Sequence, residues 1–219
     1  MNRINLATLA VAAAFFQSAA IGQASQPQVT EDGLVLQPSS HIGLVYRAPN
    51  VSFAHYRRVM VDPVGVAFKR TWERDHKKMK AETIEELRQR AAESFHEEIV
   101  NEIVKRGKFE LTDRAAPDVL RVRAYIVRLD ITAPEAGTIQ NAHTYLRSAG
   151  TMTLVVELHD AASGAIIARI IDGEQSSGIG TIQQADQIFN SSEARLAFMN
   201  GARLTHEAIN VAQTEREIN

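Results

Sequence analysis

The stretch TMTLVVELHDAASGAIIARII, residues 151–171, decides the fold of this chain. In its first half, apolar and polar residues alternate, which is typical of a β-strand with one buried face. Met152, Leu154, Val156 and Leu158 share one face, and Thr153, Glu157 and His159 share the other. A second apolar segment, residues 165–171, follows after residues 161–164. Two strands separated by so short a connection predict a β-hairpin.

The turn of this hairpin also contains residues that could suggest catalysis. Asp160 favours the first position of a turn, and Gly164 can adopt a positive φ at its exit. Ser163 precedes that glycine, but it lacks the strand–turn–helix context in which a hydrolase presents its nucleophile. Nothing in the sequence places a base beside Ser163. The pattern therefore favours a turn over a catalytic serine.

Three further segments are predicted to be strands. VLRVRAYIVRLDI, residues 119–131, alternates at first, and its phase slips near Arg128, which indicates a β-bulge or an end of pairing. RRVMVDPVGVAF, residues 57–68, is rich in valine. Pro63 has no N–H to donate, so this strand lies at an edge of the sheet or breaks at the proline. KFELTD, residues 108–113, is a short strand.

Two segments are predicted to be helices. The first begins at a capping box formed by Thr83 and Glu86 and ends at Gly107, which would take a left-handed conformation. Its apolar stripe has spacings of three and four residues and consists of Ile84, Leu87, Ala91, Phe95, Ile99 and Ile103. The second helix runs from Asn190 to about Thr214. We expect an α+β fold: an antiparallel sheet of about four to five strands, packed by a long central helix and a C-terminal helix.

The N-terminal region predicts export. Arg3 precedes the apolar run LATLAVAAAFF, residues 6–16, and small residues follow, which is the layout of a secretory signal peptide. The run is shorter than the roughly 20 residues that a bilayer span needs. A retained anchor or a buried helix is the alternative. We expect residues 1–24 to be a signal peptide, residues 25–57 an extended lead-in, and residues 58–219 one α+β domain in the periplasm.

Composition and motifs argue against several kinds of chemistry. The chain has no cysteine, so a disulfide, a thiolate zinc site, a cysteine nucleophile and a cysteine-linked lipid anchor are excluded. A net charge of −2 gives no electrostatic case for nucleic acid. The seven histidines show no metal-binding spacing, and SGIG, residues 177–180, lacks the context of a nucleotide-binding loop. We therefore expect no catalytic residue, cofactor or metal.

The run KRTWERDHKKMK, residues 69–80, is a candidate contact with an anionic surface. Six Lys and Arg residues and two acids surround Trp72, the single tryptophan of the chain. One interpretation places Trp72, Lys77 and Lys78 against phospholipid headgroups or a cell-wall polymer. The other is a solvated connection whose tryptophan is held in the core.

Two long connections form the other candidate site. If the strands at residues 119–131, 151–160 and 165–171 are antiparallel neighbours, the connections 132–150 and 172–189 leave the sheet at the same end. Loops of this length are commonly functional or disordered. The residues that could contact a polar ligand or partner there are His143, Tyr145, Arg147, Gln175, Ser176 and Ser177.

Three motifs together resemble a bacterial envelope family of unknown function. They are DPV at residues 62–64, PDVLRVRA at residues 117–124 and ELHDAASG at residues 157–164. The chain resembles the domain-of-unknown-function family numbered thirty-three thirteen over roughly residues 30–175. The resemblance implies an envelope location and an α+β domain, but no catalytic residues. Many members look like lipoproteins with a cysteine after the signal peptide, and this chain departs from that pattern.

These observations favour a non-catalytic binding or interaction module of the cell envelope, with an envelope protein or cell-wall component as partner. The alternative is a periplasmic small-ligand carrier or hydrolase with a pocket formed by loops 132–150 and 172–189. An enzyme would need several titratable groups to converge in one cleft, and the sequence shows only scattered ones.

Overall fold

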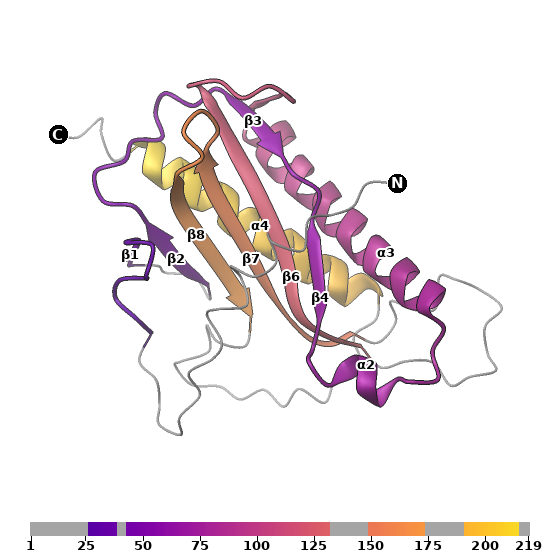
Figure 1. Cartoon of the computed structure of the whole chain (residues 1–219). Helices are drawn as coiled ribbons and strands as arrows, with labels where there is room; N and C mark the ends of the chain where they lie inside the picture. The colour runs from indigo at the N-terminus through magenta and orange to yellow at the C-terminus, as the bar shows by residue number, and fades with distance from the viewer. Residues whose placement is uncertain (1–25, 39–42, 132–148, 174–190, 215–219) are drawn as a thin grey trace.

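A computed structural model describes residues 26–38, 43–131, 149–173 and 191–214, which form a mixed sheet with helices on one face (Figure 1). The strands are β1 (Val35–Leu36), β2 (Leu44–Arg47), β3 (Arg58–Val61), β4 (Gly65–Phe68), β5 (Glu110–Leu111), β6 (Val119–Ile131), β7 (Ala149–Asp160) and β8 (Ile166–Gly173). The helices are α2 (Trp72–Asp75), α3 (Ala81–Ile99), its π-helical continuation η3 (Val100–Arg106) and α4 (Ser191–Thr214).

The eight described strands have the order β1-β2-β8-β7-β6-β3-β5, and β4 also pairs with β6. β1, β2, β8, β7 and β6 pair with one another antiparallel, whereas β3 and β4 both run parallel to β6. The predicted α+β class is confirmed, but the expected four to five antiparallel strands are corrected to a larger, mixed sheet. The lead-in supplies two extra strands, and helix α3 crosses between β4 and β6, which permits parallel pairing.

The strands of the central hairpin agree with the prediction. β7 pairs with β8, and Gly164 in the turn has a φ of 74°. β6 runs from Val119 to Ile131, and its register with β7 shifts between Val127 and Asp130, where Arg128 has a φ of 56°. The bulge predicted near Arg128 is confirmed. The break predicted at Pro63 is also confirmed, because the proline lies between β3 and β4.

The two helices cover the face of the sheet predicted to be buried, which we call the inner face (Figure 1). Leu154 and Val156 of β7 pack there with Phe95 of α3 and Phe198 of α4. The two phenylalanine rings are stacked at 5.3 Å. A Cβ built at Gly201 would lie 2.7 Å from Leu154 Cδ1, so this glycine allows α4 to approach the sheet closely.

Both ends of the long helix differ from the prediction. The helix begins at Ala81 with Lys80 as N-cap and no side-chain cap, so the capping box of Thr83 and Glu86 is wrong. Gly107 has a φ of −72°, and the left-handed residue is Lys108, with a φ of 59°. Gly107 has a different role: a Cβ there would lie 2.3 Å from the backbone oxygen of Ile103. This close approach occurs where the chain leaves the π-helical turn.

The opposite, outer face of the sheet carries a second apolar cluster. Tyr125, Val155 and Ile171 of the central strands pack there with Leu34 and Tyr46 from the lead-in. Residues 26–36, which we call the N-terminal strap, contain an antiparallel bridge between Val29 and Val35 and a hydrogen bond from the Thr30 N–H to the Leu34 carbonyl. Leu34 is 1% exposed. The lead-in is therefore part of the folded structure.

Candidate functional site

A row of polar side chains crosses the outer face from strand to strand. The register places Tyr46 beside Arg169, Arg169 beside Glu157, and Glu157 beside Arg123. The sequence pattern assigned Glu157 to this face correctly. Glu157 and Arg169 are nonetheless buried, at 5% and 3% exposure. The sequence pattern could not predict this burial, because the strap that covers them is distant in sequence.

The buried part of this row is a closed network of ion pairs. Arg169 donates from Nε and Nη2 to Glu157 Oε1 at 3.0 and 2.8 Å, and its Nη2 lies 2.7 Å from Asp32 Oδ2 of the strap. His159 Nε2 lies 3.2 Å from Glu157 Oε2. Burial raises the pKa of Glu157, but the hydrogen bonds with His159 and Arg169 outweigh it and hold that pKa below its ordinary value.

The hairpin turn binds its own polar groups. The Ser163 hydroxyl donates to Asp160 Oδ1 at 2.6 Å, and the Tyr56 hydroxyl donates to Asp160 Oδ2 at 3.0 Å. These bonds, that of Ser163 first, hold the pKa of Asp160 below its ordinary value. His159 Nδ1 lies 3.1 Å from the Gly164 carbonyl oxygen rather than at the serine. The predicted turn is confirmed, and Ser163 serves to close it.

Other buried or half-buried charges are also paired. Asp62 accepts hydrogen bonds from Arg121 at 2.9 Å and Arg123 at 3.2 Å, which joins the loop after β3 to β6. Between α3 and α4, Glu98 accepts a hydrogen bond from Arg195 at 2.9 Å. Within η3, Glu102 lies 3.1 Å from Arg106. The contacts of Asp62 and Glu98 hold elements together, and the charges of all these pairs are compensated within the fold.

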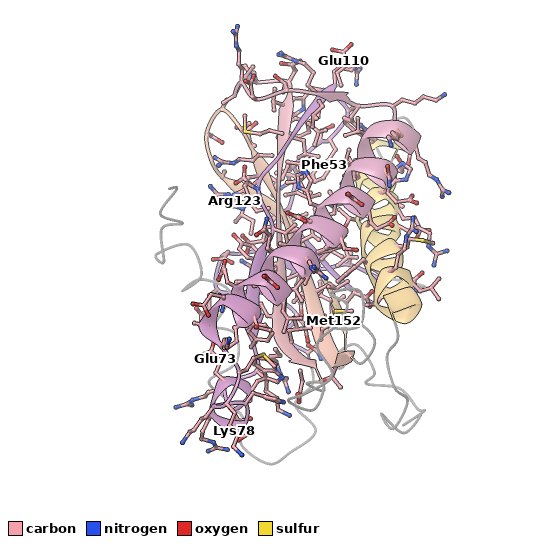
Figure 2. The ribbon with its side chains drawn as sticks, turned by 90° about the vertical axis from the view of Figure 1, so that its right-hand side faces the viewer. Phe53, Glu73, Lys78, Glu110, Arg123 and Met152 are labelled. Carbon is pink, nitrogen blue, oxygen red and sulfur yellow. The ribbon has the colours of Figure 1, made fainter. Side chains whose placement is uncertain are left out.

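Residues 69–80, which we call the basic tip, differ because their charges face outward. The tip contains helix α2 and lies at one end of the molecule, where Lys78 points away from the body (Figure 2). The tip is attached to the body by the Lys69 N–H, which donates to the Leu129 carbonyl, and by Met79, which packs against the core. Within the tip, the Trp72 N–H donates to the Lys69 carbonyl.

Trp72 anchors this tip from within. Its ring is 1% exposed and is stacked with Phe68 at 4.2 Å and with His76 at 4.3 Å. The interpretation of Trp72 as a surface-contact residue is therefore corrected: the ring belongs to the core. Lys77 and Lys78, by contrast, are exposed, as a surface contact requires.

The cations of the tip are only partly compensated. Lys69 pairs with Asp130 at 2.7 Å, Arg74 pairs with Asp75 at 3.1 Å, and Glu73 lies 3.6 Å from Arg88. The exposed cations that form no ion pair within the described part of the chain are Arg70, Lys77, Lys78 and Lys80. The tip therefore presents uncompensated positive charge on an ordered scaffold.

The second predicted site lies outside the described residues. This applies to His143, Tyr145, Arg147, Gln175, Ser176 and Ser177. The strand ends that flank the two connections are described: Ile131 pairs with Ala149, and Gly173 pairs with Thr153. Both connections thus leave the sheet at one end, as expected. The ion pair of Lys69 with Asp130 places the basic tip at that same end.

The described residues also bear on three other kinds of site: a metal centre, a membrane span and a ligand pocket. Among the described residues, no group of three or more His, Asp and Glu side chains is arranged to hold a metal ion. No helix in these ranges combines the length and apolar character of a membrane span. An open depression of about 150 Å³ is lined by Thr83, Glu86, Leu87 and Arg90, and this volume is below the usual range of ligand pockets.

The fold and the paired charges define an α+β domain with a helix-covered mixed sheet and a basic tip. A family profile, "Protein of unknown function (DUF3313)", matches residues 30–205, and the chain belongs to this family. The resemblance found in the sequence is thereby confirmed. Comparison with curated proteins gives no match.

Solved structures show distant similarity. A PelC dodecamer from Paraburkholderia phytofirmans is 10% identical with a TM-score of 0.40, over 76% of this chain and 96% of that chain. A variant of the same PelC, with one leucine replaced by methionine, is 13% identical with a TM-score of 0.38, over 74% and 95%. A putative neuraminyllactose-binding hemagglutinin homolog from Helicobacter pylori is 11% identical with a TM-score of 0.30, over 77% and 88%. Similarity at this level carries no functional conclusion for the present chain.

Proposed function

We propose that this protein is an exported, periplasmic, non-catalytic interaction module of the bacterial cell envelope, which binds its partner through the basic tip. The observation that carries the proposal is the contrast between two sets of charges. The buried carboxylates Glu98, Glu102 and Glu157 are each paired with a cation. By contrast, four exposed cations form no ion pair inside the described chain: Arg70, Lys77, Lys78 and Lys80. Exposed cations on an ordered scaffold suit binding better than proton transfer.

Export is supported by the apolar run at residues 6–16 with Arg3 before it. Cell fractionation by osmotic shock tests this part. We expect the protein in the periplasmic fraction, with a mass that corresponds to removal of about 24 residues. Recovery of the uncleaved chain from the cytoplasmic fraction would contradict it.

Site-specific photo-crosslinking in intact cells tests the interaction part. A photoreactive residue replaces Lys78 on the tip, and in the matched control it replaces Lys105 in η3, which is also exposed. We expect adducts with an envelope component from position 78 and none from position 105. Equal adducts from both positions, or none from either, would contradict binding through the tip. The mass of the adduct distinguishes a protein from a lipid or a polymer.

The alternative function is a small-ligand carrier or hydrolase that uses connections 132–150 and 172–189. It is supported by the strand ends Ile131, Ala149 and Gly173, which lie at one end of the sheet. Exchange of Tyr145 and Arg147 for alanine tests it. Loss of binding or turnover in this double variant, with the tip intact, would favour the alternative.

A further inference from the structure

We propose that the basic tip binds the anionic headgroups of a phospholipid bilayer and orients the domain with its α2 end toward the membrane. This inference rests on the proposed function, since it names the partner of the same site. It begins from the distribution of charge. Residues 69–80 carry six Lys or Arg and two acids, a charge of +4, whereas the whole chain carries −2, so the remainder carries −6.

Charge segregation of this kind produces an oriented encounter. An anionic surface attracts the tip and repels the rest of the molecule, so the favourable approach is through the tip. Glu82, Glu85 and Glu86 follow the tip on α3 and are exposed, and Glu85 pairs with Arg88. Counting these three acids and Arg88 with residues 69–80 leaves a charge of +2.

The shape of the tip fits a surface. Lys78 lies at the extreme end of the molecule (Figure 2). Trp72 is buried below it, and Met79 packs against the core, so the turn that carries Lys77 and Lys78 is held from inside. A projecting end of this kind can bring several cations to a flat surface at once. Because Trp72 is committed to the core, attraction is electrostatic and needs no inserted ring.

Sedimentation with lipid vesicles tests the inference. The mature protein, without the proposed signal peptide at residues 1–24, is mixed with vesicles of phosphatidylglycerol and phosphatidylethanolamine, and separately with vesicles of phosphatidylcholine. We expect binding to the anionic vesicles that weakens as salt is raised, because screening shortens the range of the attraction. Each surface lysine contributes about fivefold to partitioning, so Lys77→Gln with Lys78→Gln should lower it about 25-fold.

The control variant also loses two positive charges, but at positions away from the tip. Lys105→Gln with Arg203→Gln removes two exposed cations from η3 and α4, away from the tip, and should leave vesicle binding nearly unchanged. Circular dichroism confirms that both double variants fold. Equal loss in the two double variants, or equal and negligible binding to both kinds of vesicle, would overturn the inference.

The vesicle test can fail while the proposed function holds, and the crosslinking test can fail while the tip binds lipid. If position 78 gives crosslinks to a protein or a polymer in cells while vesicles are not bound, the interaction module stands and the lipid partner is wrong. If vesicles are bound through the tip but cells give no adduct at position 78, the proposed function in the envelope is wrong. The tip then binds lipid only in the purified system.

Discussion

Glu157 on β7 and Arg169 on β8 are register partners, and two hydrogen bonds from the guanidinium reach a single carboxylate oxygen. Both side chains lie on the outer face of the sheet, under the N-terminal strap, whose Asp32 is a second acidic partner of Arg169. Formation of such a buried salt bridge carries a desolvation penalty, but removal of one partner from the folded protein is destabilising. The salt bridge therefore fixes how the strap and the hairpin fit together.

Glu157→Gln should destabilise the protein. The substitution weakens the two hydrogen bonds of Arg169 with Glu157 but leaves Asp32 as its acidic partner, so we expect a loss of about 1–3 kcal/mol. Urea unfolding at neutral pH measures the change. A loss below about 0.5 kcal/mol would show that the pair is not buried in solution.

The same variant should change the acid dependence of stability. The pKa of Glu157 is lowered in the folded state, so the unfolded chain binds more protons in acid. The contribution of ionised Glu157 to the free energy of unfolding is fully present above pH 4.5, its ordinary pKa. This contribution is lost as the pH falls through the lowered pKa of the folded state. The difference in unfolding free energy between wild type and Glu157→Gln should therefore narrow below about pH 4.5. A difference that stays constant down to pH 2 would contradict this.

Asp32→Asn should loosen the strap. Asp32 is partly exposed, so solvent screening limits the loss of stability to about 1 kcal/mol. The larger effect should be faster proteolysis within residues 26–36, because the strap loses its ion pair to Arg169. Glu31→Gln is the matched control, since Glu31 is adjacent and exposed. Equal cleavage rates in the two variants would argue that the ion pair does not hold the strap.

Trp72 should report on the tip by fluorescence. It is the single tryptophan of the chain and is buried between Phe68 and His76. We expect blue-shifted emission, weak quenching by acrylamide, and no further shift when anionic vesicles are added. Trp72→Ala should cost about 3–5 kcal/mol in urea unfolding. Emission at the wavelength of exposed tryptophan would mean that the ring is not in the core.

Substitutions at Gly107 and Lys108 should change the stability of the protein in opposite directions. Gly107→Ala places a Cβ against the Ile103 carbonyl oxygen and should destabilise by about 1–3 kcal/mol. Lys108→Gly removes a side chain from a left-handed residue and should stabilise by about 1 kcal/mol. Thermal unfolding of the two variants measures both. If Lys108→Gly were the destabilising change, the left-handed position would be assigned to the wrong residue.

The sequence by itself determined the central strands β6, β7 and β8, the two long helices and their buried faces, but not the two strands of the lead-in. Apolar periods of two and of three to four residues are local, so Leu154 and Val156 on β7 and Phe95 on α3 could be assigned to the core directly. The bulge at Arg128 and the break at Pro63 were also predictable, because a slip of phase and a missing N–H are local features. Within the candidate site, the excess of positive charge in residues 69–80 was visible in the sequence.

Only the tertiary structure decided which segments meet. The parallel pairing of β3 and β4 with β6 depends on hydrogen bonds between segments about 60 residues apart, and no periodicity encodes it. Glu157 has the sequence pattern of a solvated residue, yet it is buried because the strap and β2 cover its face. Trp72 likewise lies in a run of charged residues, and only its packing with Phe68 and His76 places the ring in the core and leaves the lysines outside.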